Sequence, residues 1–99
     1  MTDKAWKHNE RMIAKYIGGK RVPITGRQRG DAPDIEHNWL SVEVKLRQRV
    51  PEWIKDGMRQ AEASKRRSAM PVLIIREKGQ RVEDALICTT LKEFRDRYL

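Results

Sequence analysis

The sequence has 99 residues, the length of one small domain with a modest hydrophobic core. It contains 22 lysines and arginines against 14 aspartates and glutamates, so the formal net charge is +8. A cationic chain with clustered arginines is typical of proteins that bind polyanions, most often nucleic acid. One cysteine, Cys88, excludes an internal disulfide and a zinc site built from several cysteines.

The N-terminal stretch MTDKAWKHNE lacks the apolar segment of a secretory signal peptide. No apolar run in the chain approaches the length that spans a membrane. We therefore expect an intracellular protein, in the cytoplasm or nucleoid of a host cell, that is not secreted and does not enter a membrane.

The first predicted element is a helix that Thr2 or Asp3 can cap and that runs to about Ile17. The glycine pair that follows Ile17 is expected to end it. Trp6 and Ile13 belong to the apolar stripe of this helix, together with Ile17. Glu10 interrupts the stripe, so its carboxylate is predicted to point toward the body of the protein.

Three strands are predicted after this helix, over residues 21–25, 34–36 and 39–47. The basic loop GRQRG separates the first two, and a turn at His37 and Asn38 joins the second to the third. The third strand alternates in polarity, with one apolar face and one face that carries Trp39, Ser41, Glu43 and Lys45.

The second half of the chain begins with Pro51, which suits the first turn of a helix from about residue 52 to residue 67. The apolar run over residues 70–76 predicts a central strand covered on both faces. A last strand is expected over residues 82–89 and a closing helix over residues 91–98. The predicted fold is a single α/β domain over residues 1–99, a small mixed sheet flanked by helices in the order αβββαββα.

The predicted turn brings three charged side chains to one face of the sheet. If the chain turns on His37 and Asn38, Asp34 lies opposite Ser41, and Ser41 is on the same face as Glu43 and Lys45. The Cβ atoms of Asp34 and Glu43 are then about 7 Å apart or less. Two carboxylates at that separation can hold one divalent cation between them.

This arrangement suits metal-assisted hydrolysis of a phosphodiester. Mg²⁺ prefers carboxylate oxygens, keeps several waters and also binds substrate phosphate, and Mn²⁺ is its expected substitute. The ion activates a bound water, and the Lys45 ammonium can orient that water. The backbone carbonyl of Val44 can supply a further oxygen ligand. An open alternative is that Glu43 and Lys45 form an ordinary ion pair on an exposed strand.

Pro33-Asp34 and Glu43-Val44-Lys45 resemble the signature of the PD-(D/E)XK nuclease superfamily. The predicted order of elements is similar to its restriction-endonuclease-like αβββαβ core. The resemblance implies that Asp34 and Glu43 bind the catalytic metal and that Lys45 assists the water. It also implies that Glu10, on the first helix, completes the metal site. Gln60 matches a glutamine that follows the E-x-K strand in relatives of archaeal Holliday-junction resolvases and in short phage-type, virus-type replication-repair nucleases.

Several basic residues are candidate contacts to a DNA backbone. Arg27 and Arg29 lie just upstream of Asp34 in a flexible loop, where guanidinium groups can clamp a phosphate. A solvated surface loop is the alternative. The remaining candidates come from other pairs of clustered cations, which are Lys20, Arg21, Arg47 and Arg49. Trp39 either stacks on a base or sugar or packs beneath a helix.

The sequence therefore predicts a magnesium-dependent DNA endonuclease that acts on branched or duplex DNA, such as a Holliday junction in recombination. A junction has two strands to cut and one chain carries one site, so a homodimer is expected. One alternative is a non-catalytic nucleic-acid-binding module with a nuclease-like fold. A third interpretation is an RNA-binding or ribosome-associated protein.

Overall fold

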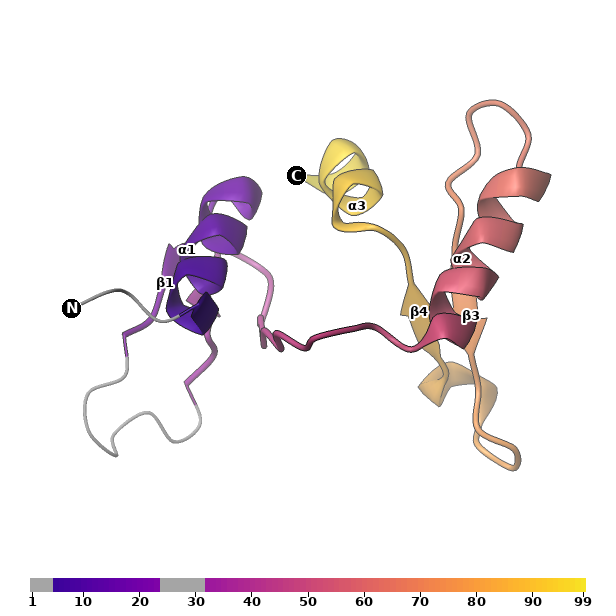
Figure 1. Cartoon of the computed structure of the whole chain (residues 1–99), viewed down its shortest axis with the longest axis horizontal. Coiled ribbons are helices and arrows are strands. Elements are labelled where there is room, and N and C mark those ends of the chain that lie inside the picture. Colours follow the sequence, from indigo (N-terminus) through magenta and orange to yellow (C-terminus); the bar gives the residue numbers. More distant parts are fainter. Residues whose placement is uncertain (1–4, 24–31) are drawn as a thin grey trace. The chain divides into compact units, whose positions relative to one another are not determined.

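The computed structural model describes residues 5–23 and 32–99 of the chain (Figure 1). The chain forms two compact units, Met1–Arg47 and Gln48–Leu99, and each contains helical structure and its own pair of strands. The loop residues Arg27 and Arg29 lie outside the described residues, as does the predicted cap of the first helix.

The first unit begins with helix α1, Ala5–Ile17, which ends where the sequence predicts. Gly18 has a φ of 78°, a left-handed conformation that glycine adopts without strain, and this residue ends the helix. A Cβ atom on Gly19 would lie 2.6 Å from the carbonyl oxygen of Glu36. The second glycine therefore lets the end of α1 approach the neighbouring strand closely.

Two short strands follow α1 in the first unit. Strand β1, Lys20–Arg21, pairs antiparallel with β2, Ile35–Glu36. Three residues form the buried apolar core between α1 and these strands, namely Ala14, Ile17 and Ile35. The predicted stripe is confirmed at Ile17, and Ile13 packs against this core as a partly buried residue.

The prediction of a strand over residues 39–47 is wrong. Within that segment the structure has an isolated antiparallel bridge between Ile35 and Val42, and Asp34 N–H donates to the Val42 carbonyl at 2.8 Å. A two-residue turn would have paired Ile35 with Leu40, so the observed pairing is displaced by two residues. An isolated bridge sets no alternation for the rest of the segment, so the shared face of Asp34, Glu43 and Lys45 stays a prediction.

The wider turn has a clear physical cause in His37. Its ring Nδ1 accepts hydrogen bonds from the backbone N–H groups of Trp39 and Leu40, each at 3.3 Å. A side chain that bonds backbone groups two and three residues ahead stabilises a local loop in place of a ladder. His37 is therefore a turn residue, as predicted, but in a longer turn.

The second unit contains helix α2, Glu52–Ser64, which is shorter than predicted, and helix α3, Leu91–Tyr98. Between them lie strand β3, Leu73–Ile75, a short 3₁₀ turn η1, Val82–Asp84, and strand β4, Leu86–Cys88. The 3₁₀ turn replaces the first part of the predicted last strand.

Strands β3 and β4 pair antiparallel, and α2 packs against β3. A Cβ atom on Gly57 would lie 2.7 Å from the side chain of Leu73, so glycine allows this close approach. Ile74 is 63% exposed, and the prediction that this strand is covered on both faces is wrong.

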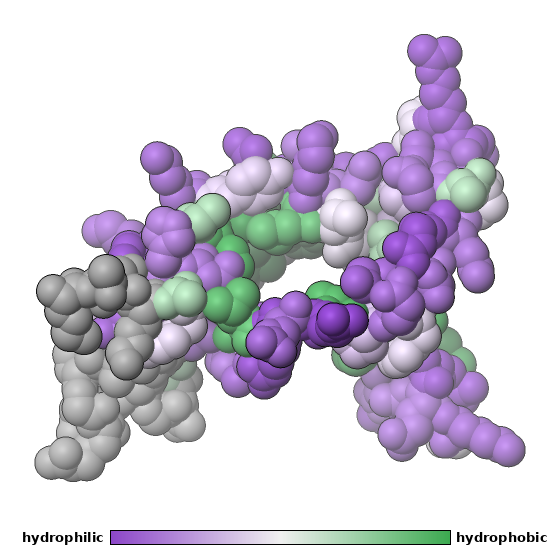
Figure 2. Space-filling model, in the orientation of Figure 1, coloured by the Kyte–Doolittle hydropathy of each residue, from purple (hydrophilic) through white to green (hydrophobic). Residues whose placement is uncertain are grey.

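The α/β class is confirmed, whereas the single mixed sheet is not. All strand pairings in the described ranges are antiparallel, and they form two separate two-stranded sheets. The nuclease-like core and the single domain stay predictions. Hydrophilic side chains make up most of the face seen in Figure 2, with apolar side chains exposed between them. None of the described helices is long and apolar enough to cross a membrane.

Candidate active site

Asp34 is the most firmly held of the predicted site residues. It is 5% exposed, its carbonyl accepts from Val22 N–H at 2.9 Å, and its side-chain Oδ2 accepts from Val44 N–H at 2.5 Å. A hydrogen bond to a carboxylate is short and strong because the acceptor is ionised. The Asp34 carboxylate is therefore anchored against the backbone between Glu43 and Lys45.

Glu43 and Lys45 form an ion pair at the surface. Lys45 Nζ lies 2.8 Å from Glu43 Oε2, and the two side chains are 63% and 61% exposed. Exposed pairs of this kind contribute about 0–1 kcal/mol to stability, so they rearrange at little cost. The structure thus contains the ion pair that the sequence left open as an alternative, in a position that solvent ions can reach.

Glu10 is buried, as predicted, but a basic side chain accounts for its burial. Its Oε1 accepts from Arg21 Nε at 2.8 Å, and both side chains are largely buried. The Arg21 guanidinium also lies over the Trp6 ring, 5.6 Å from its centroid. Glu10 was predicted as a metal ligand and Arg21 as a DNA contact, and the ion pair already occupies Oε1 of Glu10 and Nε of Arg21.

The described carboxylates do not gather into one cluster. Within residues 5–23 and 32–99, no three His, Cys, Asp or Glu side chains lie close enough together to hold a metal ion. The structure therefore brings Asp34 to the backbone of the Glu43–Lys45 segment without adding Glu10 to that group. Two carboxylates remain a sufficient protein contribution for Mg²⁺, which otherwise takes waters and phosphate oxygens.

The remaining predicted residues are spread over the chain. Gln60 lies exposed on α2 in the second unit, and its supporting role stays a prediction. Lys20 is exposed at the start of β1, and Arg47 and Arg49 are exposed as well. These three cations are accessible to a phosphate, whereas Arg21 is engaged by Glu10.

His37 has a structural role that the sequence analysis did not assign. Its Nε2 lies 3.1 Å from the carbonyl oxygen of Ile17, which can only accept, while its Nδ1 accepts from two backbone N–H groups. These partners assign a neutral ring with the hydrogen on Nε2. His37 thus joins the end of α1 to the loop that precedes Glu43.

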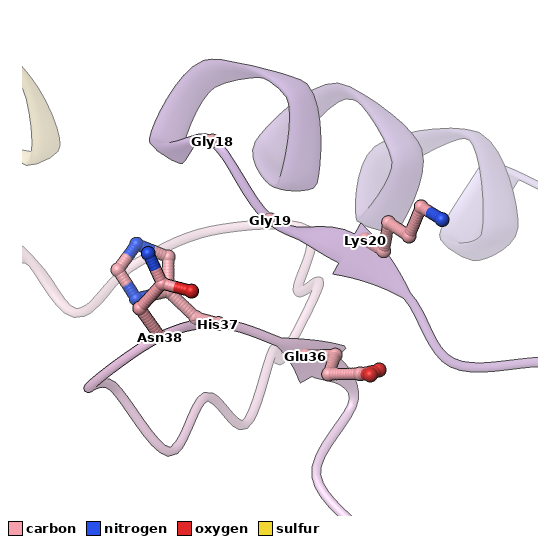
Figure 3. A pocket seen from close by; sticks show the side chains of 6 residues that line it. All are labelled: Gly18, Gly19, Lys20, Glu36, His37 and Asn38. Atoms are coloured by element: carbon pink, nitrogen blue, oxygen red, sulfur yellow. The ribbon is translucent and has the colours of Figure 1, made fainter.

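An open pocket, with a volume of about 510 Å³, lies beside this histidine (Figure 3). It is lined by Gly18, Gly19, Lys20, Glu36, His37 and Asn38. Figure 3 shows the side chains of His37 and Asn38 together at one end and those of Lys20 and Glu36 at the other. The glycine pair was the one signal in the sequence that could have indicated this hollow, through the close approach that Gly19 permits.

Comparison of the chain with protein families, with curated proteins and with solved structures gave no match in any of the three.

Proposed function

We propose that the chain is a magnesium-dependent DNA endonuclease that hydrolyses phosphodiester bonds, with branched DNA as its substrate. One observation carries the proposal: the Asp34 carboxylate accepts from the Val44 backbone at 2.5 Å, beside Glu43 and Lys45. This contact supports the proposal because it joins Asp34 to the short segment that carries Glu43 and Lys45.

In this proposal Asp34 and Glu43 hold the metal, and their roles differ. The hydrogen bond from Val44 orients the Asp34 carboxylate before any ion arrives, which lowers the ordering cost of binding. Glu43 would hold the metal with the carboxylate that now pairs with Lys45 at the surface. A bound Mg²⁺ would lower the pKa of its water and offset charge on the phosphate.

Lys45 is the proposed positioning group for the attacking water. If Glu43 held a metal, the Lys45 ammonium that now pairs with it would be available to a bound phosphate. A cation in that place stabilises the negative charge that develops in the transition state. Glu10 is proposed to support the site as a further metal ligand.

Arg21 links the proposed DNA contact to the role of Glu10. If Arg21 moves to a DNA phosphate, Glu10 is left as a buried carboxylate without its present cation. An unpaired buried charge is costly, so a divalent cation would be favoured nearby. Substrate binding and metal binding would then reinforce each other. A homodimer would supply the second site that a four-way junction requires.

The test uses purified protein with labelled four-way-junction DNA and linear duplex DNA, in Mg²⁺, in Mn²⁺ and in EDTA. We expect cleavage of the junction with either metal and none in EDTA. Variants E43Q and K45A should lose cleavage, whereas E83Q and K78A, at exposed positions of the second unit, should retain it. A folded protein that cleaves neither DNA in either metal would overturn the proposal.

The second candidate function is a non-catalytic nucleic-acid-binding module. The surface ion pair between Glu43 and Lys45 favours it, since a plain ion pair needs no chemistry. In that case E43Q leaves function intact and DNA binding unchanged or tighter. Competition between matched DNA and RNA in the same binding assay separates both candidates from an RNA-binding protein.

A further inference from the structure

Trp39 stands out among the aromatic residues of the first unit. It is 59% exposed, although tryptophan usually buries most of its surface. Its ring meets His37 in a T-shaped contact, with centroids 6.0 Å apart and ring planes at 71°. The exposure contradicts packing beneath a helix, which was one of the two roles that the sequence left open.

The loop that carries Trp39 is held in place by its neighbour. His37 accepts from the backbone of Trp39 and Leu40 and reaches back to Ile17 at the end of α1. A fixed backbone presents the indole at low entropic cost, because the residue does not have to be ordered when a ligand arrives. Trp39 is thus an ordered aromatic surface on a strongly cationic chain.

The pocket beside His37 has the polar groups that a nucleotide needs. The Asn38 amide both donates and accepts hydrogen bonds, and the Glu36 carboxylate accepts from the exocyclic amines of bases. Lys20 lies opposite Glu36 in the register of β1 and β2, and its ammonium can contact a phosphate. These groups line one pocket (Figure 3). His37, which lines it as well, contacts the Trp39 ring.

We propose that Trp39 and this pocket bind one unpaired nucleotide of DNA. The base stacks on the Trp39 ring, Asn38 and Glu36 bond its polar edge, and Lys20 contacts its phosphate. Stacking requires an accessible base face, which duplex DNA does not offer and a strand at a branch point does. The inference rests on the proposed nuclease function only in taking DNA as the ligand. It adds that the site selects DNA with an unpaired base.

The position of this binding surface fits the proposed site. Residues 37–40 form the loop between Asp34 and Glu43, the two proposed metal ligands. A nucleotide held there is tied to the same short stretch of chain that would hold the metal. Recognition of an unpaired base would therefore help to position the neighbouring phosphodiester.

The experiment measures binding in EDTA, so that no cleavage is involved. Fluorescence anisotropy compares a labelled single-stranded oligonucleotide with a blunt duplex of the same sequence. We expect W39A to weaken single-strand binding by about 5- to 150-fold. Duplex binding should change less than twofold, because phosphate contacts dominate it.

The chain offers a matched control. Trp53 on α2 in the second unit is also 59% exposed, so W53A removes an equally accessible indole. W53A should leave both affinities within a factor of two. W39F should restore most single-strand binding and W39L should not, because leucine keeps apolar bulk without an aromatic face. N38A and K20A should each weaken single-strand binding further than duplex binding.

Three outcomes would overturn the inference. Single-strand binding that is unchanged in W39A removes the stacking role. Equal losses for single strand and duplex make Trp39 a support for the loop, and rescue by W39L has the same meaning. Failure of the nuclease proposal is separate: a protein that binds single strands through Trp39 but cleaves no DNA retains this inference and loses the other.

Discussion

The two units of the chain differ in which side chains they bury. The first unit buries Glu10 and Asp34, each 5% exposed, beside a small apolar core. The second unit leaves Ile74, Leu86 and Ile87 largely exposed and carries exposed ion pairs, among them those of Arg59 on α2. Buried carboxylates need specific partners, whereas surface pairs do not. The first unit therefore holds Glu10 and Asp34 through specific partners, whereas its Glu43–Lys45 pair is as exposed as the pairs of the second unit.

The largest expected effect is on catalysis, and it should be confined to the first unit. Replacing Glu43 by Gln removes a proposed metal ligand and preserves the size of the side chain. We expect cleavage to fall about 100- to 1,000-fold, the range for losing one strong electrostatic group at a reacting centre. Single-turnover cleavage of a labelled junction in excess Mg²⁺ measures this.

E83Q is the control for this comparison, since Glu83 is an exposed glutamate of the second unit. Retained cleavage in E83Q together with lost cleavage in E43Q assigns the chemistry to the first unit. Equal rates for E43Q and the wild type would remove Glu43 from the metal site.

The next largest effect concerns stability. R21A leaves Glu10 buried without its cation, and breaking such a pair costs about 3 kcal/mol, the lower end of the range for buried pairs. R59A removes an arginine that pairs with Glu52 and Asp56 at an exposed site, so it should destabilise the protein far less than R21A does.

Urea denaturation monitored by circular dichroism measures both free energies of unfolding. The double variant E10Q/R21A tests whether the unpaired charge causes the loss, because the neutral glutamine side chain does not require the guanidinium as a partner. We expect it to be more stable than R21A alone. If R21A and R59A cost the same, the contrast between buried and exposed pairs is wrong.

A smaller effect probes the packing of the second unit. In G57A the new Cβ would sit 2.7 Å from the Leu73 side chain, so α2 or the leucine must shift. Overpacking costs about 1–3 kcal/mol, and the better helix propensity of alanine recovers about 1 kcal/mol. We expect net destabilisation of about 1 kcal/mol in thermal unfolding. L73A should make the G57A substitution neutral or stabilising, since it removes the obstructing atoms.

The smallest effect is a pH dependence at the surface of α2. The Arg59 guanidinium, followed by Lys55, holds the pKa of the Glu52 carboxyl below its ordinary value of 4.5. The ionised Glu52 carboxylate therefore stabilises the folded state fully above pH 4.5, and this contribution is lost as the pH falls through the lowered pKa. NMR titration should show the pKa of Glu52 rising toward 4.5 in R59A, with no change in R76A. A pKa that stays low in R59A would assign the shift to another group.

Much of the local structure could be predicted from the sequence. The end of α1 follows from the glycine pair, and the start of α2 follows Pro51, because these residues act through their own backbone preferences. The burial of Glu10 followed from its place in the apolar stripe. The two-residue register of the hairpin could not be predicted, since it depends on the side chain of His37 and its partners.

The sequence by itself determined the helices and the cationic character, because glycine, proline and net charge act without distant partners. It predicted one shared face for Asp34, Glu43 and Lys45, whereas Asp34 is buried and the other two side chains are exposed. Only the tertiary structure decided the partners: Val44 N–H for Asp34, Arg21 for Glu10 and Lys45 for Glu43. Local pattern sets which face a side chain occupies, whereas contacts between distant segments set what it meets there.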